Sequence, residues 1–310
     1  MHKYVISRLL ITVPILLGVL FVVFFIINLV PGDPGRTILG ISANQADVDA
    51  LNHSLGYDQP FFFRFFQYVA GILFRGDFGN SYTNTKPVIN EIAANFRFTF
   101  RFALLSTGLS VTIGISAGVM SAIKQYSALD NVTRVTAMCL AAFPSFWIGM
   151  ISIYFFSLRL GWFPSNGLDT WKHYVLPVMI NGILGSASLL RMTRTIMLEA
   201  IRQDYVRTAR AKGAPEKTVI WNHAFRNVML PLIMSIGVNF ATMMGGTVYL
   251  ENIFSMPGLG SLALSAIRTK NVPLILSTTF FLSMIFCLAV LLVDILSAFV
   301  DPRVRAKYSG

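Results

Sequence analysis

Charged residues and cysteines are both scarce in this sequence. Only 13% of its 310 residues are Asp, Glu, Lys or Arg, whereas 55% are apolar, a balance typical of membrane proteins. The two cysteines, Cys139 and Cys287, lie inside apolar runs with neither a CxxC spacing nor a histidine beside them. This pattern argues against a disulfide framework and against a Cys–His metal site, so both thiols are expected to pack as small apolar groups.

Motifs for catalysis and nucleotide binding are also missing. The sequence has no HExxH and no GxSxG pattern, and its histidines lie outside the long apolar runs, at His2, His53, His173 and His223. An intramembrane enzyme needs a nucleophile with a base, or metal ligands, at membrane depth, so an enzyme is disfavoured. Lys217-Thr218 lacks the glycines of a phosphate-binding loop, so any ATP chemistry must come from another chain.

Six uncharged runs are present instead, and they predict an all-α polytopic membrane protein with six transmembrane helices. A helix needs about 20 apolar residues to cross the hydrocarbon core. The runs are Leu9–Val30, Phe102–Ile123, Val135–Leu158, Tyr174–Leu190, Asn227–Leu250 and Val272–Val293. The fourth is short, and it can extend to Met197 if Arg191 and Arg194 snorkel to the interface. The first ends in Pro31-Gly-Asp-Pro34 rather than a small-residue cleavage site, so it is read as an uncleaved helix.

The distribution of Lys and Arg predicts the orientation. An even number of spans places both termini on one side of the membrane. That side carries fifteen Lys and Arg residues, eight of them between Arg191 and Arg226, whereas the short loops 159–172 and 251–271 carry two each. Short basic loops stay inside, so the termini are predicted to be cytoplasmic. The net charge of +11 is therefore assigned to membrane orientation and not to nucleic-acid binding.

The long segment after the first run is then external. Its aromatic portion, residues 60–74, is too short to span a membrane and contains Arg64, so an interfacial or laterally packed helix is expected. This segment is either a lip that meets an external partner or closes the pathway, or a cover over helix ends.

The charged stretch 199–231 is the main functional candidate, because it is the only long charged segment between two apolar runs. A helix is predicted over Met197–Lys212, with Leu198, Ile201, Tyr205 and Thr208 on one face and most arginines off it. Gly213 can end this helix in the left-handed conformation, and Pro215 suits the start of the next. Such a bent, basic pair of helices either docks on another protein or touches anionic lipid as a solvated loop.

A few polar or small residues stand out within the apolar runs. Gly114-Ile-Ser-Ala-Gly118 permits close helix contact. Asp294 is expected to pair with a basic residue such as Arg303 or Arg305. Polar side chains in the fourth and fifth runs should face either a neighbouring helix or a water-filled path, and they are the candidate pathway residues. These are Asn181, Asn239, Thr242 and Thr247.

Several blocks together resemble a known family. The run Arg207-Thr-Ala-Arg-Ala-Lys-Gly213, with His223-Ala-Phe-Arg-Asn227 and Leu230-Pro231, resembles the EAA loop of ABC-transporter permeases in its dipeptide and oligopeptide branch. Arg207 stands where the general EAA pattern has Glu. In this respect, too, the sequence resembles the dipeptide and oligopeptide branch. Blocks elsewhere agree, including Asn28-Leu-Val-Pro-Gly-Asp-Pro34, Arg75-Gly-Asp-Phe-Gly79, Phe143-Pro-Ser-Phe-Trp147, Leu160-Gly-Trp-Phe-Pro164, the segment 251–260 and Asp301-Pro-Arg303. One departure is Asn271, where an acid is common.

The resemblance implies a type I ABC importer permease in a bacterial or archaeal cytoplasmic membrane. It implies these parts: a first transmembrane helix (1–30), an external segment (31–97), a five-helix core (98–298) with a coupling loop (198–226), and a cytoplasmic tail (299–310). Expected partners are a homologous second permease, two cytoplasmic ATPases that bind ATP and Mg, and an extracytoplasmic binding protein, with no cofactor in this chain. The implied ATPase-coupling residues are Tyr205, Arg207, Thr208, Ala209, Arg210, Ala211, Lys212, Gly213, His223, Arg226 and Asn227.

The expected function is import of dipeptides or oligopeptides, and two alternatives stay open. The same architecture could import nickel, other metal complexes or glutathione-like compounds, because the binding protein often selects the cargo. An ATP-independent secondary transporter is the alternative of another class. Such carriers usually place several ionisable groups near the bilayer midplane, whereas here only Asp294, directly after the last uncharged run, is expected to lie within a span.

Overall fold

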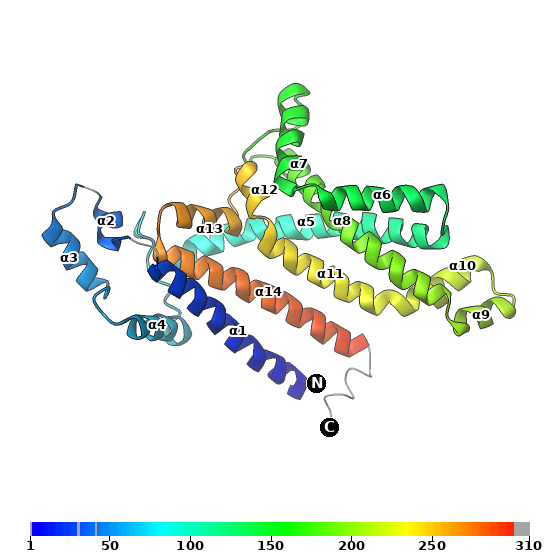
Figure 1. The fold of residues 1–310 in the computed structure, drawn as a ribbon, viewed down its shortest axis with the longest axis horizontal. Helices are drawn as coiled ribbons and strands as arrows, with labels where there is room; N and C mark the ends of the chain where they lie inside the picture. The colour runs from blue at the N-terminus through cyan, green and yellow to red at the C-terminus, as the bar shows by residue number, and fades with distance from the viewer. Residues whose placement is uncertain (1, 30–31, 41, 301–310) are drawn as a thin grey trace. The chain divides into compact units, whose positions relative to one another are not determined.

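The computed structural model describes residues 2–29, 32–40 and 42–300. In these residues the backbone is helical apart from turns, short irregular segments and one isolated bridge between Asn80 and Pro87 (Figure 1). The all-α fold class predicted from the sequence is confirmed. The predicted tail falls outside the described residues from position 301 onward.

Five helices in the described part of the chain are long and apolar enough to cross a membrane, and a bent pair makes up to six. They lie in α1 (His2–Leu29), α5 (Val88–Ile123), α8 (Lys172–Ile201), the run Glu216–Gly245 and α14 (Val272–Val300). The fourth of these runs through α10 (Glu216–Thr218), the π-helical η3 (Val219–Phe225) and α11 (Arg226–Gly246). The predicted extension of the fourth apolar run beyond Arg194 is seen in α8.

The predicted third span is not one straight helix. α6 (Ala128–Ala142) is followed by α7 (Ser145–Ser152) and the π-helical η2 (Ile153–Arg159), and the two halves meet at 95°. The break lies at Phe143, which has an extended backbone with ψ of 133°, and Pro144. A proline disfavours helical geometry in the residue before it and provides no N–H for the helix, so the chain turns there.

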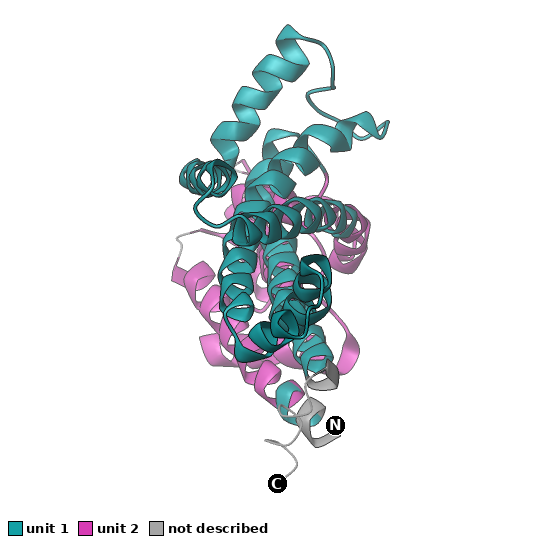
Figure 2. Ribbon diagram, turned by 90° about the vertical axis from the view of Figure 1, so that its right-hand side faces the viewer, with its two compact units in different colours: residues 1–8, 100–256, 286–310 teal, residues 9–99, 257–285 magenta. Residues whose placement is uncertain are grey.

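The chain divides into two compact units, which Figure 2 distinguishes by colour. Unit 1 comprises residues 1–8, 100–256 and 286–310, and unit 2 comprises residues 9–99 and 257–285. Unit 2 contains α2 (Pro34–Leu39), α3 (Gln45–Ser54), α4 (Phe61–Ala70), η1 (Gly71–Arg75) and α13 (Leu259–Arg268). Unit 1 contains α9 (Asp204–Ala211) and α12 (Val248–Ile253).

An aromatic core holds unit 2 together. Phe24 of α1 lies 5.3 Å from Phe61 and 5.5 Å from Phe65 between ring centroids, and Leu276 of α14 packs on the same cluster. Asn271 is fully buried and donates from Nδ2 to Ser81 Oγ at 2.8 Å. A neutral amide therefore ties the segment between α1 and α5 to the start of α14.

Two close contacts position α8 in unit 1. A Cβ placed on Gly118 would lie 2.6 Å from Thr193 Cβ, and one on Gly114 would lie 2.7 Å from Leu189 Cβ. The close contact expected from these two glycines is therefore present between α5 and α8. On α8, Arg194 also donates from Nε to Asp130 Oδ1 at 2.7 Å, and Asp130 is fully buried.

Asp294 has a basic partner, as predicted, and in the described residues that partner is Arg8. Asp294 Oδ2 lies 3.3 Å from Nη1 of Arg8, and the two side chains are 18% and 39% exposed. Arg303 and Arg305 lie outside the described residues. The prediction of a basic partner near the helix end is right, but the pairing shown is with the N-terminal helix, which sequence separation alone does not reveal.

Candidate functional site

The charged stretch forms an elbow between α8 and α11, defined here as residues 202–225. The single helix predicted over residues 197–212 is wrong, because α8 ends at Ile201 and α9 begins at Asp204. Gln203 between them has an extended backbone (φ −71°, ψ 152°) and occupies the N-cap of α9. Asp204 then places a carboxylate in the first turn, where the helix dipole favours it, so a new helix starts in a new direction.

The predicted joint after this helix is observed. Gly213 has φ of +79°, a left-handed conformation that glycine adopts without a Cβ clash. Pro215 follows with φ of −63° and ψ of 144° and caps α10. The elbow therefore consists of α9, a tight turn, α10 and η3.

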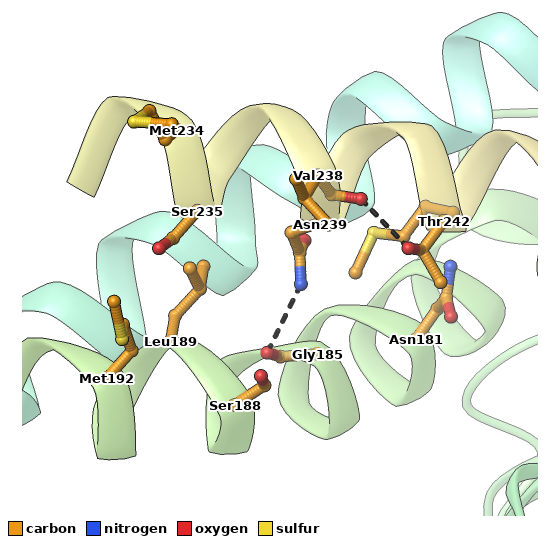
Figure 3. Close-up of a pocket in the computed structure, with 11 residues that line it drawn as sticks. Asn181, Gly185, Ser188, Leu189, Met192, Met234, Ser235, Val238, Asn239 and Thr242 are labelled. Atoms are coloured by element: carbon orange, nitrogen blue, oxygen red, sulfur yellow. Dashed lines mark hydrogen bonds between the residues drawn. The ribbon is translucent and has the colours of Figure 1, made fainter. Parts of the chain in front are cut away.

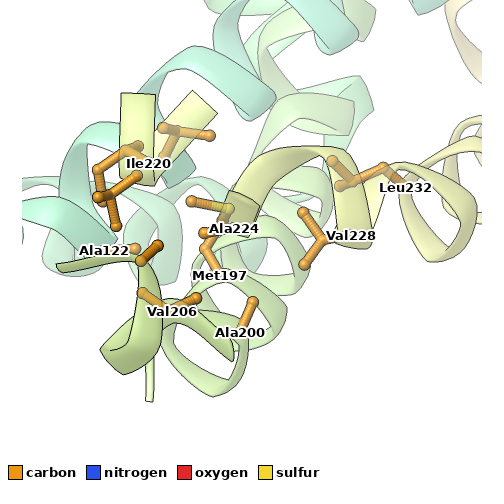
Figure 4. Close-up of a cluster of buried hydrophobic side chains, with 11 residues drawn as sticks. Ala122, Met197, Ala200, Val206, Ile220, Ala224, Val228 and Leu232 are labelled. Atoms are coloured by element: carbon orange, nitrogen blue, oxygen red, sulfur yellow. The ribbon is translucent and has the colours of Figure 1, made fainter. Parts of the chain in front are cut away.

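A buried apolar core fixes the elbow to the long helices. Val206 of α9 is fully buried, as are Met197 at the end of α8 and Val219 and Ala224 of η3. Figure 4 shows Val206, Met197 and Ala224 beside Ala122 of α5 and Val228 of α11. The full set is Val119, Ala122, Met197, Ala200, Val206, Ala209, Val219, Ile220, Ala224, Val228 and Leu232. Close-packed interiors transmit displacement, so the elbow is expected to move together with α8 and α11.

The break in the helix changes which face is buried. Tyr205 and Thr208, predicted to share an apolar face with Leu198 and Ile201, are exposed, and Val206 and Ala209 are buried in their place. The residues implied as coupling residues mostly lie on the exposed surface. Exposed are Tyr205, Arg207, Thr208, Arg210, Ala211, Lys212, Gly213, Arg226 and Asn227; His223 is half-buried and Ala209 buried.

This exposed surface is basic. The side chain of Arg207 is 73% exposed, and Arg202, Lys212 and Lys217 are exposed as well. Arg210 donates from Nη2 to Glu216 Oε1 at 2.7 Å, and hydrogen bonding to Glu216 raises the pKa of Arg210. That pair joins α9 to α10 across the turn at Gly213. Solvent-exposed pairs stabilise a fold weakly, so the apolar core holds the elbow more firmly than this contact does.

A cavity of about 560 Å³ lies between α8 and α11 (Figure 3). Three of the four candidate pathway residues line it, namely Asn181, Asn239 and Thr242. Its other lining residues are Gly185, Ser188, Leu189, Met192, Met234, Ser235, Val238 and Met243. The wall therefore mixes small polar groups with flexible apolar ones, and none of the described residues that line it is charged.

The two asparagines of the cavity are incompletely hydrogen-bonded. Asn239 Nδ2 donates to the Gly185 carbonyl oxygen at a long 3.5 Å, whereas its Oδ1 has no partner. Asn181 Nδ2 also lacks a partner. Buried polar groups without partners are costly, so these two amides have unused capacity for hydrogen bonds to polar groups in the cavity.

The fourth candidate lies elsewhere. Thr247 is buried and donates from Oγ1 to Glu251 Oε1 at 2.8 Å, and it is not among the residues lining the cavity. Ser188, Ser235 and the lining methionines were not singled out from the sequence. Ser188 follows Asn181 by seven residues, and Ser235 precedes Asn239 by four, so helical periodicity from the two asparagines would have found both serines.

Within residues 2–29, 32–40 and 42–300, no group of three or more His, Cys, Asp or Glu side chains is placed so that it could hold a metal ion.

The sequence matches a known transport family along almost its whole length. Residues 111–306 match the family described as "Binding-protein-dependent transport system inner membrane component", and residues 1–103 match its N-terminal companion. The chain is 36% identical over 307 residues to a protein of Escherichia coli (strain K12) named "Glutathione transport system permease protein GsiC", covering 99% of this chain and 100% of that protein. The protein of the same name from Pectobacterium atrosepticum gives the same identity and coverage.

Solved structures share the fold. An inward-facing form of the MetNI methionine ABC transporter superimposes with a TM-score of 0.59 at 14% identity, covering 70% of this chain and 99% of that one. A second crystal form of that transporter gives a TM-score of 0.56 at 17% identity, covering 71% and 98%. At such identities the likeness shows the fold alone, and it agrees with a type I importer architecture.

Proposed function

This chain belongs to the family of binding-protein-dependent transport system inner membrane components, the permease subunits of ABC importers, and we propose that its cargo is a small peptide of the glutathione kind. It is an integral protein of a bacterial inner membrane. The relatives named as glutathione permeases support this choice over longer peptides. The uncharged cavity wall agrees with a pathway on which a polar, flexible peptide exchanges hydrogen bonds with amides and hydroxyls.

The proposed assembly contains a homologous second permease, two cytoplasmic ATPases and an extracytoplasmic binding protein. ATP and Mg are bound by the ATPases, since this chain has no phosphate-binding loop. The termini and the elbow are proposed to be cytoplasmic, because the short loops on their side carry most of the Lys and Arg residues.

The elbow is proposed to be the part that the ATPases hold. Its exposed face offers Tyr205, Arg207 and Lys212 to a partner, while its opposite face is fixed by Val206 and Ala209 in the shared core. This division of one short helix into an exposed polar face and a fully buried apolar face is the observation that carries the proposal. A docked partner that moves the elbow would displace α8 and α11 as well.

The cavity is proposed to be this subunit's share of the pathway. α8 and α11 both line it, and both enter the elbow core through Met197, Ala200, Val228 and Leu232. ATP-driven movement of the elbow therefore reaches the cavity wall. A switch of this kind needs contacts that differ in free energy between two states, and the unpaired amides of Asn181 and Asn239 are suited to provide them.

The experiment is ATP-dependent uptake by the complete transporter reconstituted in proteoliposomes with its binding protein. Radiolabelled glutathione, a dipeptide and a nickel chelate serve as parallel cargoes. Arg207→Glu reverses an exposed charge, and Gly213→Pro imposes a φ incompatible with +79°. Both are expected to leave the protein in the membrane and to separate ATP hydrolysis from uptake. Lys124→Glu, an exposed cation in the turn after α5, is the control and should transport normally.

The outcomes separate the proposals. Normal uptake by both elbow variants would contradict the coupling role. Uptake of the nickel chelate in preference to both peptides would contradict the cargo. Uptake by this chain without ATP or partners would favour a secondary transporter instead.

A further inference from the structure

A second cavity, of about 490 Å³, lies wholly within unit 2. It is formed by the last turns of α1, by Arg64 of α4 and by the start of α14. One wall is aliphatic, with Val23 and Ile27 of α1 and Ile275 of α14. This cavity is separate from the one between α8 and α11, and nothing in the proposed transport cycle uses it.

Among the described residues, two cations and no acid line this cavity. The cations are Arg64 and Lys270. The Arg64 guanidinium lies 5.0 Å from the centroid of the Tyr57 ring and donates to Asn28 Oδ1, whereas its Nε is buried with no acceptor. Burial raises the pKa of Tyr57, so its phenol remains protonated and cannot neutralise the guanidinium. The cavity therefore has an excess of positive charge and of hydrogen-bond donors.

Lys270 occupies a strained turn. Its φ of +51° is left-handed, a conformation that glycine adopts at lower cost, and it follows the end of α13. Lys270 is exposed and lines the cavity, so this strained turn places an ammonium group there. Neighbouring Asn271 is held by Ser81, so the turn is fixed in position.

Both cations lie at the level where two membrane-spanning helices end. Asn28, the partner of Arg64, is one residue from the end of α1, and Lys270 is two residues before the start of α14. On α4, next to Arg64, Phe62, Phe63 and Phe66 are 57–64% exposed. An amphipathic helix with exposed phenylalanines is suited to lie at the boundary between headgroups and acyl chains.

We propose that this cavity binds the phosphodiester headgroup of an anionic glycerophospholipid such as phosphatidylglycerol. Arg64 and Lys270 hold the phosphate, and one acyl chain follows the aliphatic wall formed by α1 and α14. A guanidinium and an ammonium beside a hydrocarbon wall match a phosphate attached to a hydrocarbon chain. A soluble peptide carboxylate has the charge but lacks the chain.

The test is lipid retention and binding by the complete transporter, purified in detergent and measured by native mass spectrometry. Phosphatidylglycerol, phosphatidylcholine and inorganic phosphate are titrated separately. Loss of one hydrogen bond to a charged group weakens binding by about tenfold or more, so Arg64→Gln and Lys270→Gln are each expected to reduce phosphatidylglycerol affinity by at least that factor. Lys270 is exposed, so its variant is expected to fold even if Arg64→Gln does not.

The matched controls are Arg75→Gln and Lys86→Gln, two exposed cations of the same segment that do not line the cavity. They should bind phosphatidylglycerol as the wild type does, and phosphatidylglycerol should raise the midpoint of thermal unfolding of these controls but not of Lys270→Gln. Equal losses in controls and cavity variants would overturn the proposal, since they would indicate a diffuse charge effect. Equal affinity for phosphatidylcholine, or displacement of the lipid by inorganic phosphate or by a free peptide, would overturn it as well.

Discussion

The core beneath the elbow and the cavity both include residues of α8 and α11, but the two regions are built in opposite ways. In the core, Val206 and Val219 of the elbow pack with Met197 of α8, and all three are fully buried. In the cavity, the same helices leave about 560 Å³ unfilled, and Asn181 and Asn239 keep amide atoms without partners. One end of the helix pair is packed to move as a unit, and the other is left free to exchange contacts.

This difference indicates that the two regions along α8 and α11 have different roles. A close-packed core transmits displacement with little loss, whereas a wall of small polar and methionine side chains can rearrange around different contents. Stability is therefore expected to depend on the elbow end and on what anchors α8, while cargo handling depends on the cavity. The following variants separate these two roles, from the largest effect on stability to the smallest.

Val206→Asp should have the largest effect. It places a carboxylate in the elbow core, where no cation is among the packed residues, and should lower the free energy of unfolding by roughly 4 kcal/mol. The measurement is the midpoint of thermal unfolding, together with protease sensitivity of the elbow. Gln203→Asp is the control: it puts the same side chain at the N-cap of α9, where an Asp is favourable, and should be neutral or stabilising. A Val206→Asp protein as stable as this control would refute a close-packed elbow.

Asp130→Asn should have the second largest effect on stability. It leaves the Arg194 guanidinium, whose side chain is 18% exposed, without its charge partner, at an expected cost of about 3 kcal/mol. Glu216→Gln removes the partner of Arg210 in the exposed pair and should cost under about 1 kcal/mol. Unfolding of both variants by heat measures the difference. Equal effects would mean that the Asp130 pair does not anchor α8.

Gly118→Ala should cost less, about 1–3 kcal/mol, because its Cβ would meet Thr193 and the Leu190 carbonyl oxygen and push α5 from α8. Gly108→Ala, on the same helix with nothing within 4 Å, should instead stabilise by about 0.5–1 kcal/mol through helix propensity. Opposite shifts of the thermal midpoint are expected. Shifts of the same sign would show that α5 and α8 are not in close contact at Gly118.

Asn181→Leu and Asn239→Leu should change stability least, by less than about 1 kcal/mol in either direction, because few hydrogen bonds are lost. Uptake should nevertheless suffer, with a higher KM for cargo and an unchanged ATPase rate. Met192→Leu, a volume-conserving change in the same wall, is the control and should leave uptake unchanged. A large loss of stability without a change in KM would assign the asparagines to helix packing and not to cargo.

The sequence predicts most of the spans and the position of the elbow, because long uncharged runs and a turn at Gly213 and Pro215 are local signals. Prediction from the sequence fails where contacts between residues far apart in the chain determine the structure. Nothing near Asp294 indicates Arg8 as its partner. The run Val135–Leu158 is predicted as one span unless Pro144 is taken to break it, as the structure shows. No local signal marks the break at Gln203, because the segment has no Gly or Pro, yet the break changes which face of α9 is buried.

Local sequence signals are also insufficient to predict which polar residues line the cavity between α8 and α11. Asn181, Asn239 and Thr242 stand out as polar residues in apolar runs, and the structure gathers them around one cavity. Thr247 has the same local signal and turns instead toward Glu251. Whether a polar residue faces a cavity or a buried partner depends on how α12 packs, which no periodicity within one helix determines.

The most direct test of the central claim is the distance between the elbow and the cavity wall during turnover. Spin labels at Lys212→Cys and Val238→Cys, in a chain with Cys139 and Cys287 replaced by serine, report this distance by double electron–electron resonance in the complete transporter. Both positions are exposed, at the end of α9 and on α11. We predict the same distance distribution without nucleotide and after turnover with ADP trapped by vanadate, because the elbow moves with α11. A shifted or newly split distribution would show that the elbow hinges independently, and it would contradict the account.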